Sequence, residues 1–227
     1  RQPVQRQRVL RLNARSAWLR YEIPLHHLVT ARAGLRWTAT DFNSEHLLMP
    51  RFGLDLQWSD QTAFSLGAGR FAQPPLYREV RDVSAAKRAR LRAQKADNIS
   101  LGMKHRWKER NLQIQVEAYY KKMRDLISYQ VFDVRSVYSG SNDSRGYAWG
   151  LDAHLRGEFT RGTTSWISYS YLVAREDIEG DGYGFLPRPS DQRHTLSFQL
   201  EDRMEKYPGS RFHVRIILGS GTPFTHM

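Results

Sequence analysis

Apolar and polar residues alternate along much of the chain, most regularly between residues 97 and 126. Apolar side chains recur there at every second position, namely Ile99, Leu101, Met103, Leu112, Ile114 and Val116. A period of two is typical of an extended strand, because successive side chains point to opposite faces. The polar residues 108–111 (Lys-Glu-Arg-Asn) interrupt the pattern and predict a tight turn. The stretch therefore predicts a long hairpin with one apolar and one charged face, which fits either a soluble sandwich or a transmembrane barrel.

The same alternation predicts about ten strands in the whole chain. They span residues 8–23, 27–40, 47–58, 62–72, 97–107, 112–126, 146–159, 164–174, 192–201 and 211–218. Residues 84–96 are rich in Ala, Arg, Lys and Leu, which favour helix, and they predict a short helical segment. The fold class indicated is all-β and antiparallel.

The predicted connections tend to alternate between short and long. Short turns are expected near 24–26, 59–61, 108–111, 160–163 and 202–210, and long loops at 73–95, 128–145 and 175–191, with 41–46 intermediate. Outer-membrane barrels have this asymmetry, with short periplasmic turns and longer external loops. Aromatic residues lie near predicted strand ends, where interfacial girdles occur: Trp37, Trp58, Trp107, Trp149 and Tyr171. These features favour a transmembrane antiparallel β-barrel, in which turn 108–111 is periplasmic and the long loops are external.

Composition narrows the class further. Hydrophobic residues make up 40% of the 227 residues, and the mean hydropathy is −0.63. No run approaches the roughly 18 apolar residues that a spanning helix needs, which excludes a helical membrane protein but leaves a barrel open. The chain has no cysteine, so it can form neither a disulfide framework nor a thiolate metal site. Residues 1–10 lack the apolar core of a signal peptide, so we expect an internal or mature segment.

The chain is strongly basic, with 35 Lys and Arg against 23 Asp and Glu and a net charge of +12. A nucleic-acid partner is disfavoured because the basic residues are spread along the strands as well as gathered in one loop, and the basic loop 73–95 has only Tyr77 to stack on bases. A solvated, anion-friendly lumen or a rim that faces lipopolysaccharide accounts better for this distribution.

Six segments, taken in order, resemble the barrel of TonB-dependent outer-membrane receptors. They are 49–75 (with Pro-Arg-Phe-Gly at 50–53, Gly-Ala-Gly-Arg-Phe at 67–71 and Pro-Pro at 74–75), 91–107, 116–127, 144–157, 186–200 (with Pro-Ser-Asp-Gln-Arg-His at 189–194) and 219–225. The chain departs from the family pattern at Ala93 and Gln94, where a proline and a glutamate are usual, and at Asp152, which stands in a glutamate position.

The resemblance implies part of a 22-stranded barrel in the outer membrane of a Gram-negative bacterium. Residues 1–227 would form part of a single barrel domain, without the plug domain and the closing C-terminal strand. The implied function is energised uptake of a scarce nutrient such as a metal chelate, glycan or peptide. An inner-membrane energy-coupling protein would act through the plug, outer-membrane lipid and lipopolysaccharide would surround the wall, and a surface lipoprotein could cover it. The alternative is a passive porin or a structural component of an outer-membrane assembly.

Charged and polar residues on the polar face of the predicted strands are candidates for a lumen that contacts plug and substrate. They are Arg51, Asp55, Lys104, Arg106, Glu117, Asp152, His154 and Arg156. The alternative is that these residues pair across strands and hold the wall together. Opposite them lie Leu, Ile, Val and Phe, which suits lipid, because Lys or Arg facing lipid at mid-membrane costs about 2–4 kcal/mol.

The loop at 73–95 is the candidate ligand-binding segment. Its basic residues could capture an anionic ligand or contact lipopolysaccharide phosphates, and those that we single out are Arg78, Arg81, Arg88, Arg90 and Arg92. The alternative is an ordinary solvated loop.

Other chemistry finds little support in the sequence. Residues 176–182 crudely resemble a calcium loop, but they lack the distal glutamate and full alternation of an EF-hand, so a flexible acidic loop is favoured. The eight histidines are scattered without zinc spacing, and Ser139-Gly140-Ser141 lacks the context of a nucleophile elbow. An outer-membrane enzyme is therefore disfavoured, and we expect no catalytic residue, metal or cofactor.

Overall fold

The computed structural model describes residues 13–41, 43–81, 83–132, 135–160, 163–203 and 210–223. Most of this is strand: β1 (Ala14–His26), β2 (Val29–Thr40), β3 (His46–Gln57), β4 (Thr62–Gln73), β5 (Gln94–Trp107), β6 (Leu112–Leu126), β7 (Tyr129–Phe132), β8 (Arg135–Tyr138), β9 (Ser144–Thr160), β10 (Thr163–Ile178), β11 (Leu186–Pro187), β12 (His194–Arg203) and β13 (Arg211–Gly219). Two four-residue helices, α1 (Tyr77–Val80) and α2 (Ala85–Arg88), and the 3-10 turn η1 (Lys108–Arg110) complete it.

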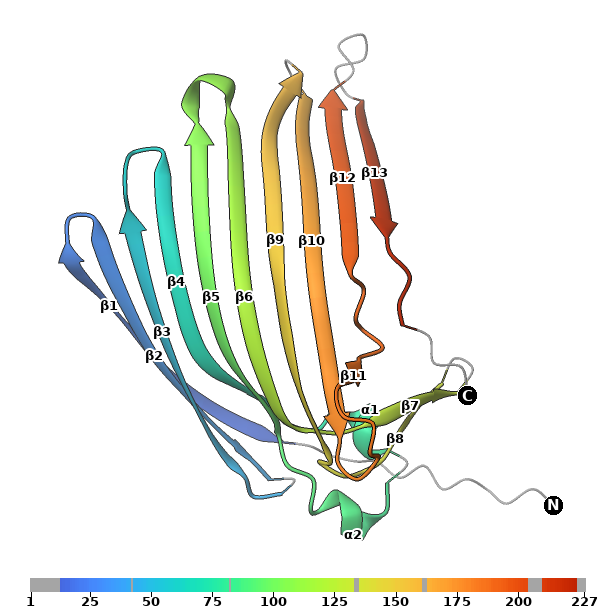
Figure 1. Ribbon diagram of the computed structural model, residues 1–227. Coiled ribbons are helices and arrows are strands. Elements are labelled where there is room, and N and C mark those ends of the chain that lie inside the picture. Colours follow the sequence, from blue (N-terminus) through green and yellow to red (C-terminus); the bar gives the residue numbers. More distant parts are fainter. Residues whose placement is uncertain are drawn as a thin grey trace.

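The strands form one curved antiparallel sheet in sequence order (Figure 1). The order is β1-β2-β3-β4-β5-β6-β9-β10-β12-β13, with β11 paired to β10, while β7 and β8 form a separate hairpin. The all-β barrel class predicted from the alternation is confirmed as a partial barrel wall, and β1 and β13 are its two edges among the described residues. No helix in the described part of the chain is long and apolar enough to cross a membrane.

Short and long connections leave the sheet at opposite ends, as Figure 1 shows. We call these the short-turn end and the long-loop end. The turn at 108–111 is a single 3-10 turn closed by Asn111 in the left-handed conformation. At the other end lie α1, α2, the β7–β8 hairpin and β11. The predicted alternation of turn lengths is therefore present in the fold.

Four predicted boundaries were wrong. The first turn lies at 27–28 and not at 24–26, because Pro24 continues β1 opposite Thr30. Proline is tolerated there because the register is irregular between Pro24 and His26. The connection 128–145 contains the β7–β8 hairpin, and β10 extends to Ile178, inside the predicted loop. The expected helix over 84–96 shrinks to α2, and the chain becomes extended again as β5 begins at Gln94. Residues 8–12 and 204–209 of the predicted first strand and last turn, and the end of the 219–225 segment, lie outside the described residues.

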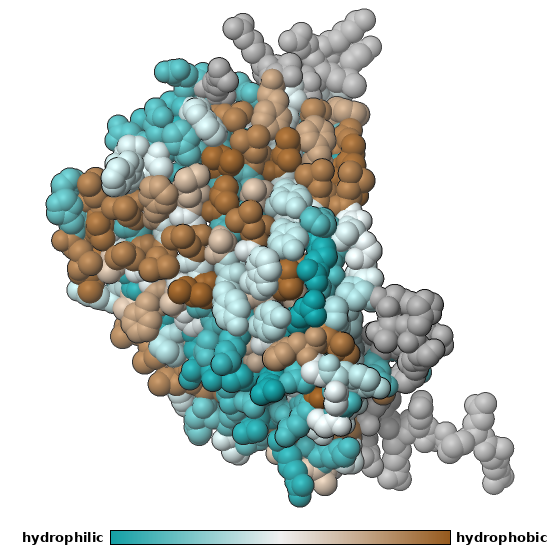
Figure 2. Space-filling view, in the orientation of Figure 1, coloured by the Kyte–Doolittle hydropathy of each residue, from teal (hydrophilic) through white to brown (hydrophobic). Residues whose placement is uncertain are grey.

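Apolar residues are exposed along the strands and buried only near the loops. Leu101 is 58% exposed and Ile217 57%. The two buried clusters lie at the long-loop end and contain Leu47, Met49 and Ala93, and Val80, Leu91 and Ile127. Figure 2 shows brown apolar residues gathered over the strands and hydrophilic residues around the long loops. A soluble sheet would cover its apolar face with a second layer, so this distribution fits a lipid-facing wall.

Candidate functional site

Register places the eight predicted lumen residues on the same face of the sheet. Residues that pair directly across strands point to the same side. Lys104, Gln115 and His154 form one such row across β5, β6 and β9. Arg106, Gln113 and Arg156 form the next row, and Arg106 donates a hydrogen bond to the Gln113 side chain at 3.2 Å. The remaining predicted residues occupy matching positions, namely Arg51, Asp55, Glu117 and Asp152.

Contacts on this polar face differ from residue to residue. Asp55 pairs with Arg32 on the neighbouring strand at 2.6 Å, which is the cross-strand pairing that was the alternative to a ligand role. Glu117 and Asp152 stand directly opposite each other. Like charges in that position repel each other, so this pair favours a cation between them.

A groove on the polar face of β1–β4 gathers four arginines. It encloses about 480 Å³ and is lined on its polar side by Trp18, Arg20, Arg32, Gly34, Arg36, Arg51, Gly53 and Gly67. We call it the arginine groove. Gly34 leaves backbone open at the floor of the groove: the nearest atom to a Cβ added there would be the Leu19 carbonyl oxygen at 3.6 Å. Of these residues, sequence reasoning singled out Arg51 alone, because the groove depends on strand register, which alternation does not give.

Three cations on the polar face near the long-loop end have no carboxylate partner among the described residues. The Arg36 guanidinium donates to the Ser16 hydroxyl at 3.3 Å. The Arg51 guanidinium lies 4.5 Å from the Phe71 ring centre, and the Lys121 ammonium 5.9 Å from that of Tyr119. Aromatic faces hold a cation in place without neutralising it. Their charge therefore remains available to an anion.

The basic connection between β4 and β5 is a packed structure rather than an open loop. Arg78, Arg81 and Arg90 are exposed, whereas Arg88 donates to the Val83 carbonyl at 3.0 Å. Arg92 pairs with Asp125 at 3.6 Å. Of the five candidates, Arg88 and Arg92 therefore also brace the loop.

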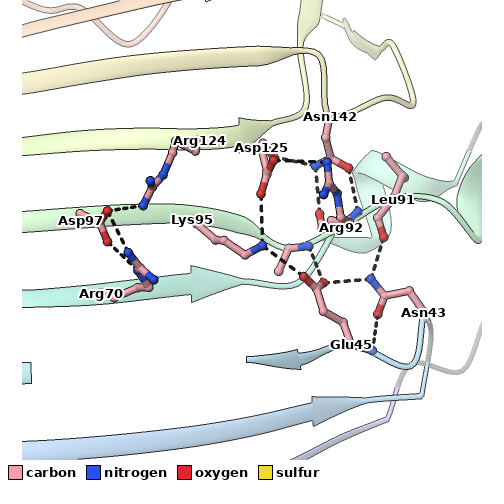
Figure 3. A network of polar contacts seen from close by, with 11 residues as sticks. Asn43, Glu45, Arg70, Leu91, Arg92, Lys95, Asp97, Arg124, Asp125 and Asn142 are labelled. Atoms are coloured by element: carbon pink, nitrogen blue, oxygen red, sulfur yellow. Dashed lines mark hydrogen bonds and ion pairs between the residues drawn. The ribbon is translucent and has the colours of Figure 1, made fainter. Parts of the chain in front are cut away.

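A network of polar contacts fixes the long loops to the sheet (Figure 3). The Lys95 ammonium lies 3.1 Å from Asp125 and 3.4 Å from Glu45. Glu45 also accepts a hydrogen bond from the Ala93 amide at 2.7 Å. The Asn142 side chain joins two loops by donating to the carbonyls of Arg92 and Asp125. These bracing residues stand at strand ends without periodic spacing, so no sequence signal pointed to them.

The acidic segment 176–182 does not gather into a metal site. Glu176 pairs with Arg188 at 3.1 Å and Asp177 with Arg145 at 2.8 Å, so two of its carboxylates are already engaged. No group of three or more His, Cys, Asp or Glu side chains suited to a metal ion occurs among the described residues. The geometry favours a structural role for this loop.

The sequence profile described as "TonB dependent receptor-like, beta-barrel" matches residues 2–221. The chain belongs to the TonB-dependent receptor family. This confirms the resemblance inferred from the six segments, and it places the wall in the outer membrane of Gram-negative bacteria. The residues described above therefore lie on the wall of a receptor-type β-barrel, which has one lipid-facing side and one polar side.

Solved structures of TonB-dependent receptors share the fold. The FrpB iron transporter of Neisseria meningitidis matches with a TM-score of 0.65 and 17% identity, over 90% of this chain and 32% of that one. The ferric enterobactin receptor PfeA of Pseudomonas aeruginosa matches with a TM-score of 0.64 and 17% identity, over 91% and 33%. The alcaligin receptor FauA of Bordetella pertussis matches with a TM-score of 0.62 and 14% identity, over 92% and 37%.

The chain thus spans about a third of the length of these receptors. A comparison with curated proteins gave no match. The neighbours are transporters and receptors rather than enzymes.

Proposed function

We propose that the full-length protein imports a scarce, anionic nutrient across the outer membrane, with energy supplied by an inner-membrane coupling protein acting through a plug domain. A metal chelate is the favoured class, and an acidic glycan or peptide would present the same charge. The polar face of the sheet lines the lumen, and the chain itself performs no enzymatic step.

The observation that carries this proposal is the unpaired positive charge on the polar face. Arg36, Arg51 and Lys121 lie near the long-loop end without a carboxylate partner in the described part of the chain. The exposed Arg78 and Arg90 add charge above them. Charge-assisted hydrogen bonds from guanidinium groups suit carboxylate, phosphate and metal-chelate oxygens. The iron transporter and the ferric enterobactin receptor among the structural neighbours support a metal chelate.

In the proposed mechanism, the basic connection attracts the anion first, and the arginine groove then receives it inside the lumen. Clefts lined by one sign of charge raise the local concentration of the opposite sign. Arg78, Arg81, Arg88, Arg90 and Arg92 would act in the first step. The wall ion pairs such as Arg32–Asp55 keep the lumen geometry fixed.

The test replaces Arg36 and Arg51 by glutamine in the full-length protein. Uptake of ferric chelates of different charge is measured in cells that depend on this protein for iron. We expect uptake of anionic chelates to fall at least tenfold and uptake of neutral ones to change little. Arg15→Gln is the matched control, because Arg15 pairs with Ala39 on the opposite face of the sheet.

Energy coupling is tested in the same cells by removing the inner-membrane coupling protein. Loss of uptake supports a receptor. Uptake that persists would assign a passive porin, and a wild-type chain that imports no chelate of either charge would favour a structural role.

A further inference from the structure

On the apolar face of the sheet, the rows nearest the long-loop end carry charged side chains. One row of directly paired positions across β4, β5, β6, β9 and β10 consists of Ala68, Ile99, Tyr120, Trp149 and Val173. The next row toward the long loops consists of Arg70, Asp97, Lys122, Tyr147 and Arg175. Arg124, Arg145 and Asp177 follow in the row after that. All of these side chains point to the side that faces lipid.

Distance along the strands places these charges at the edge of the membrane. Ten residues separate Asp97 from Trp107, which lies at the short-turn end of the same face. At about 3.4 Å per residue and a strand tilt of about 40°, this corresponds to a height of about 26 Å. The apolar band of an outer-membrane barrel is about 25 Å tall. The charges therefore begin where the hydrocarbon ends.

Aromatic side chains mark the same boundary. The Tyr120 and Tyr147 rings stack with centres 6.4 Å apart, and Tyr147 contacts Phe185 at 5.3 Å. Trp149 contacts Tyr171 at 5.5 Å. Such girdles occupy the level of lipid headgroups.

Positive charge exceeds negative charge in this band. The cations are Arg70, Lys122, Arg124, Arg145 and Arg175, which we call the basic belt, and the carboxylates beside them are Asp97 and Asp177. Asp97 accepts hydrogen bonds from both Arg70 and Arg124 (Figure 3). Asp177 accepts from Arg145.

The pairing orients the guanidinium groups without covering them. The Arg70, Arg124 and Arg145 side chains stay 47%, 44% and 71% exposed. A planar guanidinium that binds a carboxylate on one edge still has N–H groups on its other edges, and these suit a second anion. Lys122 makes no ion pair within hydrogen-bonding distance in the described part of the chain.

We propose that the basic belt is a binding site for the phosphate groups of lipopolysaccharide in the outer leaflet. Tyr120 and Trp149, one row nearer the membrane centre, pack against the acyl chains, and Arg70, Lys122 and Arg124 bind the phosphates above them. The carboxylate of Asp97 fixes the geometry of the two arginines that flank it. This site lies on the opposite face from the arginine groove, so it does not depend on what the protein imports.

The test uses the full-length protein purified from outer membranes in mild detergent, with added lipopolysaccharide as the probe. The belt variant is Lys122→Gln with Arg124→Gln, which leaves Asp97 paired to Arg70. The matched control is Lys121→Gln with Arg51→Gln, which removes the same charge at similar height from the polar face. Heat-modifiable migration confirms that both variants are folded.

Each basic residue near an anionic lipid surface contributes about a factor of five in affinity. We therefore expect the belt variant to bind lipopolysaccharide about 25-fold more weakly and the control to bind like the wild type. Lipopolysaccharide stripped of its lipid A phosphates should bind wild type at least as weakly as the belt variant binds the intact form. Equal binding by all three proteins, equal loss in the control, or binding that ignores the phosphates would overturn the proposal. Displacement of lipopolysaccharide by millimolar inorganic phosphate would also overturn the proposal, because it would show that the basic belt binds a free anion.

Discussion

At the scale of single residues, two glycines of the polar face differ in what a methyl group would meet. A Cβ at Gly150 would lie 2.4 Å from the Tyr171 carbonyl oxygen and 2.6 Å from the Tyr119 hydroxyl. At Gly34 the nearest atom would be 3.6 Å away. We predict that Gly150→Ala destabilises the full-length protein by about 1–3 kcal/mol, because the backbone cannot yield as a flexible side chain can.

Gly34→Ala is the control for this effect. It should leave stability unchanged or raise it by up to about 1 kcal/mol, since alanine loses less backbone entropy in a strand. Urea unfolding of the protein in lipid vesicles measures both variants. Equal stability of the two would show that the crowding at Gly150 relaxes freely.

Asp41 carries a pH-dependent contact at the long-loop end of β1 and β2. The Asn13 side chain and backbone amides donate to its carboxylate at 2.7 and 2.9 Å, and these hydrogen bonds lower the pKa of the Asp41 carboxyl below the ordinary value of 3.8. A depressed pKa in the folded state stabilises the contact above pH 3.8, and the contribution is lost as the pH falls through the lowered pKa.

We therefore predict that hydrogen-exchange protection of the Asn13 amide decreases as the pH falls below 3.8, once intrinsic exchange rates are taken into account. In Asp41→Asn the protection should no longer depend on pH. Protection that falls equally in both proteins would assign the change to another group.

At the scale of elements, the Asn142 side chain, in the connection before β9, joins the β4–β5 connection to the end of β6. Asn142 accepts from the Arg92 amide at 2.7 Å and donates to the carbonyls of Arg92 and Asp125 at 3.0 and 2.6 Å. We predict that Asn142→Ala weakens the attachment by about 1–3 kcal/mol, because three hydrogen bonds to backbone groups are lost. Limited proteolysis of intact cells should then cut within residues 74–93 at least tenfold faster. Ser136→Ala on β8 should not change the rate, and a slow rate in both would contradict the bracing role.

The strands were predictable from the sequence, whereas the loops were only partly so. Apolar residues at every second position, such as Leu112, Ile114 and Val116, reveal a strand in the sequence, because one face meets lipid and the other meets water. Arg175 and Asp177 continue β10 on the lipid side, but their charges break the apolar pattern, so the sequence suggested a loop. The candidate residues on the polar face could be found from the alternation of positions along each strand alone. The arginine groove could not, because it needs the register that sets Arg51 opposite Gly34 and so diagonal to Arg36 on β2.

At the scale of the whole molecule, the lipid-facing assignment can be tested with two neighbours on β6. Val116 points to the apolar face and Gln115 to the polar face, near the middle of the strand. We predict that Val116→Arg costs about 2–4 kcal/mol in the membrane, whereas Gln115→Arg costs little. Urea unfolding in vesicles and the amount of protein in the outer membrane measure the difference. Equal tolerance would refute a lipid-facing surface.

The sequence was enough to predict the class of architecture, but not the strand neighbours or the packing of the loops. Family membership and the short-turn and long-loop ends agree with the barrel expected from the sequence. The structure adds which strands are neighbours and how the loops fold over the polar face, through contacts such as Gln94 with Glu79 at 3.0 Å. Such contacts depend on tertiary packing and leave no local pattern.

The irregularity between Met123 and Leu126 has a consequence for how this wall tolerates insertion and deletion. Two residues, Arg124 and Asp125, stand there against the single residue Arg145, and Asp125 takes a left-handed conformation. Successive side chains in a strand alternate between the two faces, so one extra residue exchanges the faces of those that follow. It turns Leu126 away from lipid and lets Ile127 join the buried cluster under the loops. Deleting one residue there would move each side chain from that point up to β7 to the opposite face of the sheet. In this family, length at that position should therefore be inherited more strictly than the identity of any side chain near it.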